Sequence, residues 1–107
     1  MPDAVLNVQP LDRDEADRLA GTMKVLADPT RLQILNLLYA HPRGLAVSAL
    51  HAMLGRLTQP TMSHHMGILR RSGLVDVKRS GVFAVHTLNH AAMRQLSDVL
   101  RPGSRRR

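Results

Sequence analysis

The alternation of apolar and polar positions is clearest over residues 58–73, where it predicts a helix with two different faces. At about 100° per residue, Met62, Met66 and Leu69 fall on one apolar stripe. The opposite side is small, polar and basic and contains no acid: Pro60, Thr61, Ser63, His64, Gly67 and Arg71. A solvated helix face usually carries Glu and Lys, so this face is suited to a negatively charged partner that approaches closely. An ordinary surface helix with few acids remains the alternative.

Residue types mark both ends of this helix. Thr58 can cap the first turn, and Pro60 is tolerated there because its missing N–H would have no partner anyway. Gly73 can adopt the left-handed conformation that ends many helices. We therefore expect the helix to lie between Thr58 and Gly73.

Three further helices are predicted before it. Asp12 and Glu15 have capping-box spacing, Asp28-Pro29 begins a second helix that runs to about Ala40, and a third spans roughly 47–54. Apolar residues cover more than one stripe of the second helix, which we expect to be nearly encircled by protein: Leu32, Ile34, Leu35, Leu37 and Leu38. Because only a short link joins residues 47–54 to Thr58, these two helices form a predicted helix-turn-helix.

Two β-rich runs follow, over residues 74–79 and 82–88, with Ser80-Gly81 between them. Two central residues that end in Gly predict a tight hairpin. A two-stranded hairpin is marginal alone, so it should lie against the helices and project its tip, with Lys78 and Arg79, as a wing toward the same polyanion.

A last helix is predicted from His90 to about Leu100, capped by Asn89. The predicted fold is mainly α with a small β-hairpin: a winged helix-turn-helix of five helices and a two-stranded wing, homodimeric. Residues 1–10 are expected to be a flexible arm, 11–100 a DNA-binding and dimerisation domain, and 101–107 a disordered basic tail.

Composition narrows the class of protein. At 107 residues the chain suits one domain, and with only Tyr39 and Phe83 as aromatics its core depends on aliphatic side chains. The absence of cysteine excludes disulfides, thiolate nucleophiles and sulfur-based metal sites. Because there is no bilayer-length apolar run and no signal-like N-terminus, we expect a cytoplasmic protein.

Charge is distributed unevenly around the formal net of +7. Residues 1–28 hold six acids and three bases, a net of −3, whereas residues 29–107 hold two acids and twelve bases, a net of +10. A basic body behind an acidic first helix indicates a polyanion-binding face on one side, as in proteins that bind nucleic acid.

Two blocks, Leu26-Ala27-Asp28-Pro29-Thr30-Arg31-Leu32-Gln33-Ile34-Leu35 and the run from Gln59 to Val75, resemble the ArsR/SmtB family of bacterial transcriptional regulators. The resemblance implies a homodimeric winged helix-turn-helix whose first and last helices form the dimer interface. It also implies repression of an operator in double-stranded DNA, relieved by an inducer that is often a metal ion. By the same resemblance, Gln59, Ser63 and His64 contact DNA, and Thr61, Arg71, Lys78 and Arg79 complete the predicted DNA-binding set.

The chain departs from the family at its inducer sites. Ala46 and Ser48 stand where a common site has two cysteines, and at the family's last-helix site His90 is present but Ala92 follows and no later histidine exists. Arsenic, cadmium and lead are therefore disfavoured as inducers. Nickel, zinc or cobalt bound by imidazole and carboxylate remain candidates, as does a non-metal cue or partner protein.

The histidines divide by expected role. His64 is expected to contact DNA and His65 to pack against the protein, while His41 and His51 have no other candidate ligand near them in the sequence. This leaves His86 and His90 as metal candidates, with acids of the first helix as possible further ligands across the dimer.

Two other classes of protein are disfavoured by the sequence. The absence of a phosphate-binding Gly loop and of a nucleophile motif argues against an enzyme. The basic wing and the acid-free helix face argue against a winged helix that contacts only other proteins.

Overall fold

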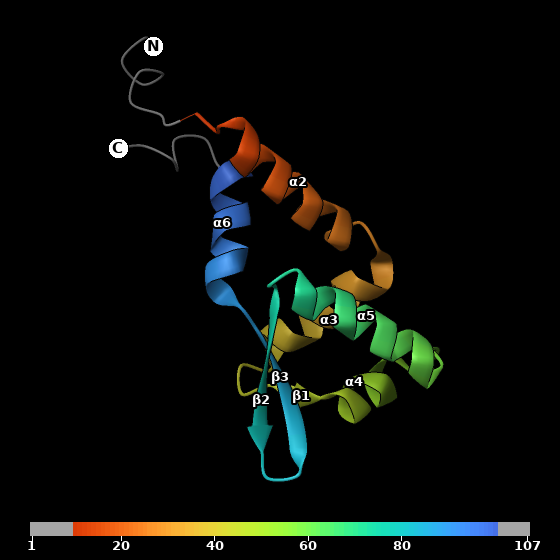
Figure 1. Ribbon diagram of the computed structural model, residues 1–107. Helices are drawn as coiled ribbons and strands as arrows, with labels where there is room; N and C mark the ends of the chain where they lie inside the picture. The colour runs from red at the N-terminus through yellow and green to blue at the C-terminus, as the bar shows by residue number, and fades with distance from the viewer. Residues whose placement is uncertain (1–9, 101–107) are drawn as a thin grey trace.

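The computed structural model describes residues 10–100, which form five α-helices and a small three-stranded sheet (Figure 1). The helices are α2 (Arg13–Leu26), α3 (Pro29–Ala40), α4 (Val47–Leu54), α5 (Gln59–Arg71) and α6 (His90–Leu100). The strands are β1 (Leu45–Ala46), β2 (Val75–Ser80) and β3 (Phe83–Leu88). The predicted mainly α winged helix-turn-helix is confirmed. The predicted basic tail, and the predicted arm apart from Pro10, lie outside the described residues.

Each of the predicted side-chain caps forms. In every case a side-chain oxygen accepts a hydrogen bond from the backbone N–H three residues later, which satisfies one of the donors that a helix start leaves without a partner. The pairs are Asp12 with Glu15 at 2.8 Å, Asp28 with Arg31 at 2.9 Å, Thr58 with Thr61 at 3.3 Å and Asn89 with Ala92 at 3.0 Å. The four helix starts therefore lie where the sequence predicts them.

The core lies where α3 and α5 meet the sheet and α4. Met62, Met66 and Leu69 of α5 are at most 2% exposed, which confirms the predicted apolar stripe. They belong to one buried cluster with side chains from α3, α4, α6, the two long strands and the residue before β2: Ile34, Leu35, Leu38, Leu50, Leu74, Val75, Leu88 and Leu96. One face of α5 is thereby fixed against the protein, and its other face is left to solvent.

The expectation that α3 is nearly encircled by protein is wrong for one side of the helix. Leu32 is 52% exposed and Tyr39 is 67% exposed. They border an open hollow of about 450 Å³ between α3, the end of α2, β3 and α6, lined by Leu26, Leu32, Leu35, Asn36, Tyr39, Leu88 and Met93. The apolar residues on this side of α3 therefore exceed what one protomer covers.

The sheet has the antiparallel order β1-β3-β2, so the two-stranded wing carries a third, two-residue strand that the sequence did not predict. In β1, Leu45 pairs with His86 and Ala46 with Val85. The chain can approach β3 so closely because Gly44 has no side chain, since a Cβ there would lie 2.3 Å from Val85 Cγ1.

The hairpin turn lies one residue later than predicted. Ser80 pairs with Phe83, so the two central residues are Gly81 and Val82, not Ser80 and Gly81. Gly81 has a φ of +62°. Glycine adopts a positive φ more easily than other residues, which suits the first central position of this turn. Gly81 is therefore the first central residue of the turn, whereas the sequence predicts it as the second.

The protomer is elongated, with extents of 54 × 23 × 20 Å. In Figure 1, the start of α2 and the end of α6 lie together at one end of the molecule, the two helices diverge from there, and the β2–β3 turn projects at the other end. Leu96 is the buried residue of α6. No helix in residues 10–100 is long and apolar enough to cross a membrane.

Candidate nucleic-acid interface

Helices α4 and α5 form the helix-turn-helix. α4 ends at Gly55, whose left-handed backbone turns the chain, and Thr58 then caps α5. The Thr58 hydroxyl also donates to Thr61 Oγ1 at 3.0 Å, and the His51 ring hydrogen-bonds the Leu57 carbonyl within the turn. These contacts join residues that are close in sequence, so the geometry of the turn is determined locally.

The exposed face of α5 carries the predicted DNA-contacting residues of this helix. Gln59, Thr61, Ser63, His64 and Arg71 are all exposed, and together they are called the recognition face below. No acid lies on α5, and its last turn is basic with Arg70 and Arg71. The structure therefore brings five of the seven predicted DNA-binding residues onto one exposed helix face.

Gly67 changes the expected picture of this face. The sequence suggested a gap there, but Gly67 is buried because an arginine of its own helix covers it. A Cβ at Gly67 would lie 3.1 Å from Arg71 Nη1 and 3.8 Å from Arg70 Nη2. In the free protein, the space beside Gly67 is thus occupied by the Arg71 guanidinium, which lies back along the helix.

A hollow of about 210 Å³ separates the beginnings of α4 and α5. It is lined by Val47, Ser48, His51, Gln59, Met62 and Ser63. Two residues of the recognition face, Gln59 and Ser63, therefore share a recess with Ser48, an exposed hydroxyl in the first turn of α4. The sequence did not predict Ser48 as a polar neighbour of the recognition face, because this recess joins two helices and no pattern within one helix indicates it.

The remaining predicted DNA contacts, Lys78 and Arg79, lie on β2 near the projecting turn, and both are exposed. Lys78 is opposite Val85 and Arg79 is opposite Ala84, so successive pleats direct the two bases to opposite faces of the hairpin. The tip also exposes Val82 and Phe83. The wing thus presents one cation on each side of an exposed apolar end.

His65 is packed and has partners in α3, unlike its exposed neighbour His64. Its side chain is 12% exposed, and Nδ1 lies 3.2 Å from Arg31 Nη1 and 4.0 Å from Asp28 Oδ2. The backbone N–H of Arg31, which donates to Asp28, is the main reason that the pKa of Asp28 lies below its usual value, and burial opposes this effect. Asp28 therefore faces His65 as a carboxylate.

The two predicted metal ligands lie in different environments. His86 is 3% exposed on β3 and its Nδ1 is buried without a hydrogen-bond partner. Burial, and secondarily the charge of Arg70, lowers the pKa of His86, and a hydrogen bond with the Leu45 backbone opposes this. His90 is exposed at the start of α6. Among residues 10–100 of one protomer, no group of three or more His, Asp or Glu side chains could hold a metal ion.

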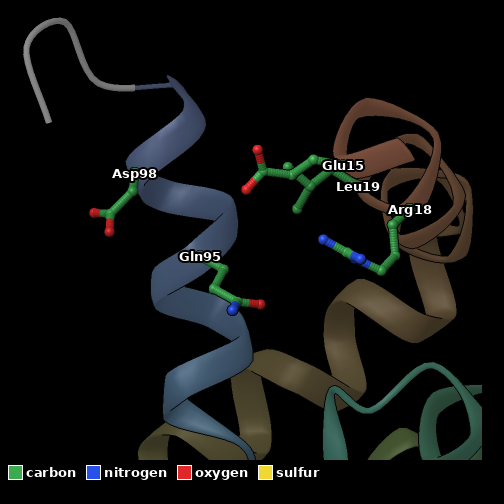
Figure 2. A pocket seen from close by; sticks show the side chains of 5 residues that line it. All are labelled: Glu15, Arg18, Leu19, Gln95 and Asp98. Carbon is green, nitrogen blue, oxygen red and sulfur yellow. The ribbon is translucent and has the colours of Figure 1, made fainter. Parts of the chain in front are cut away.

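A small polar recess of about 120 Å³ lies between α2 and α6, lined by Glu15, Arg18, Leu19, Gln95 and Asp98. In Figure 2, Glu15 and Arg18 extend from α2 toward α6 and Gln95 extends back, while the Asp98 carboxylate points away from the recess. The facing sides of the two terminal helices are therefore polar at this level.

Comparison with known proteins supports this geometry. Residues 26–78 match a family model described as a helix-turn-helix domain. The chain is 38% identical to the transcriptional regulator NmtR of Mycobacterium tuberculosis over 89 residues, which are 83% of this chain and 72% of NmtR. It also resembles the homodimeric winged helix-turn-helix DNA-binding domain of Mb0332 from Mycobacterium bovis, a possible ArsR-family regulator. That match has a TM-score of 0.67 and 31% identity, and covers 85% of this chain and 84% of the other. The chain belongs to the ArsR family of transcriptional regulators.

The relatives of this chain are not all named as repressors. The Vibrio cholerae protein HlyU, named a transcriptional activator, is 30% identical over 97 residues, 91% of this chain and 86% of HlyU. Membership therefore gives this ArsR-family chain its fold and class, and leaves the sign of regulation to experiment.

Proposed function

We propose that this ArsR-family protein is a homodimeric, sequence-specific DNA-binding regulator that represses transcription until an inducer releases it from its operator. The observation that carries the proposal is the acid-free recognition face of α5, with five polar or basic side chains exposed on a helix whose other face is buried. A major groove admits one α-helix, and side chains of these types can hydrogen-bond base edges or phosphates.

The contacts divide into two kinds. Gln59, Ser63 and His64, from the first half of α5, are assigned to base edges in the major groove. Thr61 and Arg71, together with Lys78 and Arg79 of the wing, are assigned to the phosphate backbone, which positions the protein without specifying sequence.

Dimerisation through α2 and α6 is the second part of the proposal. Leu100 is 71% exposed at the end of α6, and in Figure 1 the two terminal helices lie close only where α2 begins and α6 ends, and diverge from there. A protomer of this size gains stability by covering such surface, and the resemblance to the homodimeric Mb0332 domain supports a two-fold pair. Two-fold symmetry would set the two α5 helices about one DNA turn apart.

The inducer is the third part of the proposal. A nickel, zinc or cobalt ion would use the exposed His90 more readily than His86, which is buried and feels the charge of Arg70. One protomer's described residues do not fit such an ion, so further ligands would have to come from the partner protomer. A non-metal cue or a partner protein is the alternative. Calorimetric titration of each ion into the dimer, with and without operator DNA and with His90→Ala, distinguishes the two.

The decisive test is DNA binding measured by fluorescence anisotropy on a duplex selected from a random pool. His64→Ala should weaken binding to the selected site by about 1–3 kcal/mol and relax its sequence preference. Lys78→Ala and Arg79→Ala should weaken selected and random duplexes alike and reduce the salt slope by about one each. Arg13→Ala, which removes an exposed cation paired with Asp17 on α2, is the control. Binding that is insensitive to salt would exclude the proposal, and a promoter-reporter assay decides between repression and activation.

A further inference from the structure

One arginine side chain joins three helices. Arg31, in the first turn of α3, donates from Nε to the Val25 carbonyl at 2.6 Å, in the last turn of α2. Its Nη1 lies 3.2 Å from His65 Nδ1, in the middle of α5 and 34 residues away in sequence. The Val25 carbonyl is one of the acceptors that the end of α2 leaves without an intrahelical partner. The guanidinium therefore connects the end of α2 to the helix that carries the recognition face.

The contact with His65 depends on the protonation state of the ring. Arginine can only donate, so Nδ1 must offer its lone pair, which requires a neutral imidazole with its proton on Nε2. A protonated ring would direct an N–H at Arg31 and place two cations together. Its better partner would then be the Asp28 carboxylate, whose Oδ2 lies 4.0 Å from the same nitrogen. The groups that face the ring are Asp28 and Arg31 of α3 and His64 of α5, whose ring centre is 6.1 Å away.

The place of His65 on α5 makes its contacts relevant to the orientation of the recognition face. His65 lies about 100° around α5 from His64, between the buried stripe and the exposed face. Because Cα atoms lie about 2.3 Å from the helix axis, α5 would turn by roughly 25° if the Cα atom of His65 moved by about 1 Å around that axis. Binding constellations tolerate only about 10–20° of misorientation.

We propose that Arg31 is a positioning residue for DNA recognition: by joining the Val25 carbonyl to neutral His65 it holds α5 in its DNA-binding orientation, and protonation of His65 transfers the ring to Asp28 and releases α5. The proposal rests on the DNA-binding function proposed above and adds a contact that links the recognition helix to α2. Under it, operator affinity carries a component that is lost in acid and that belongs to His65.

The test is operator affinity measured by anisotropy between pH 8.0 and 5.5 at constant ionic strength, the range over which histidines titrate. The proteins are the wild type, Arg31→Ala, Arg31→Lys, His65→Gln and the Arg31→Ala/His65→Gln pair, with Arg13→Ala as a matched surface control. Glutamine keeps an acceptor for Arg31 but does not titrate, so the wild-type to His65→Gln ratio removes the pH dependence of His64 and the other histidines. Far-UV circular dichroism and sedimentation confirm fold and assembly.

We expect Arg31→Ala to lose about tenfold in affinity at pH 8.0, the size of an ordinary coupling between sites, with an unchanged salt slope. Arg31→Lys should lose nearly as much, because one ammonium cannot reach two acceptors in fork geometry. The wild type should lose affinity in acid relative to His65→Gln, and the Arg31 and His65 effects should not add.

Three results would overturn the proposal. A salt slope reduced by one in Arg31→Ala would show that Arg31 contacts a phosphate. Wild-type affinity in Arg31→Lys would show that only the charge matters, and a wild-type pH profile in His65→Gln would show that His65 is not the group that responds to pH. If Arg31→Ala does not fold, Arg31→Lys and His65→Gln still decide. Wild-type binding at pH 8.0 is measured in the same series, so failure of the DNA-binding function itself would be seen separately.

Discussion

Gly67→Ala should make the protein more stable and a weaker DNA binder at once. The residue is inside α5, where glycine costs backbone entropy that alanine does not. A Cβ at this position would lie 3.1 Å from Arg71 Nη1, so the guanidinium must move by a few tenths of an ångström. That atom is the far end of a flexible side chain, and its displacement is inexpensive in the free protein.

The magnitude follows from a matched glycine in the same chain. Gly21 lies inside α2, and a Cβ there would meet no atom within 4 Å. Gly21→Ala should therefore raise the free energy of unfolding by the full helix-propensity gain of about 0.5–1 kcal/mol. Gly67→Ala should gain slightly less, because it must also move Arg71. Both are measured by urea denaturation followed by far-UV circular dichroism at one fixed protein concentration.

The two substitutions should differ on DNA. Gly67→Ala displaces the guanidinium of Arg71, which is proposed to contact a DNA phosphate. Losing that contact should cost about 1 kcal/mol, roughly fivefold in Kd. Gly21→Ala should leave Kd unchanged. In an Arg71→Ala background, Gly67→Ala should have no further effect, because both changes act through one side chain.

An additional loss in that background would refute this reasoning and show that the backbone at Gly67 is itself approached by DNA. Unchanged DNA affinity in the single Gly67→Ala variant would also refute it, because it would show that Arg71 does not contact DNA. A fall in stability would mean that the Arg71 guanidinium cannot yield as the geometry indicates.

Three further predictions concern stability and assembly. Because folding lowers the pKa of His86 below its usual value of 6.5, the unfolded chain binds a proton at His86 more readily than the folded chain. The contribution of His86 to stability is therefore fully present above pH 6.5 and is lost in acid. His86→Leu should remove this pH dependence of the unfolding free energy, measured in urea titrations at about pH 7.5 and 5.5. Leu100→Glu should split the dimer in sedimentation experiments, and the same change at the half-exposed Leu32 shows whether the α3 hollow belongs to the interface. Gly44→Ala, at a φ of +94° and 2.3 Å from Val85 Cγ1, should lower the unfolding free energy by at least about 2 kcal/mol in urea denaturation.

What the sequence predicts well here is what is local. Each cap involves a side chain and a backbone N–H three residues apart, so residue type alone places the start of the helix, as with Thr58 and Thr61. The apolar stripe of α5 is likewise a property of one helix, and Met62, Met66 and Leu69 are buried as predicted. The recognition face follows as the complement of that stripe.

Features that join distant segments were missed. The Arg31–His65 contact spans 34 residues, and β1 exists only because Leu45 meets His86. No period or cap marks either. Leu96 shows the same limit: it lies on α6, one of the two helices expected at the dimer interface, and yet it is 6% exposed within one protomer, which makes Leu100 the better probe of the interface.

The distribution of the molecule's surfaces bears on how an inducer could act at a distance from DNA. α2 carries Asp14 and Glu15 in its first turn, at the end of the molecule opposite the wing, while its last turn is bonded through Arg31 to α5. A dimer built on α2 and α6 would therefore place its interface and the recognition helices at two ends of one continuous set of contacts. In such a dimer, a ligand that changed the angle between the two α2 helices would also move Val25, and with it the Arg31 side chain that contacts His65. In the proposed dimer the two α5 helices would lie about one DNA turn apart, so a small change at the interface would be sufficient to release the operator.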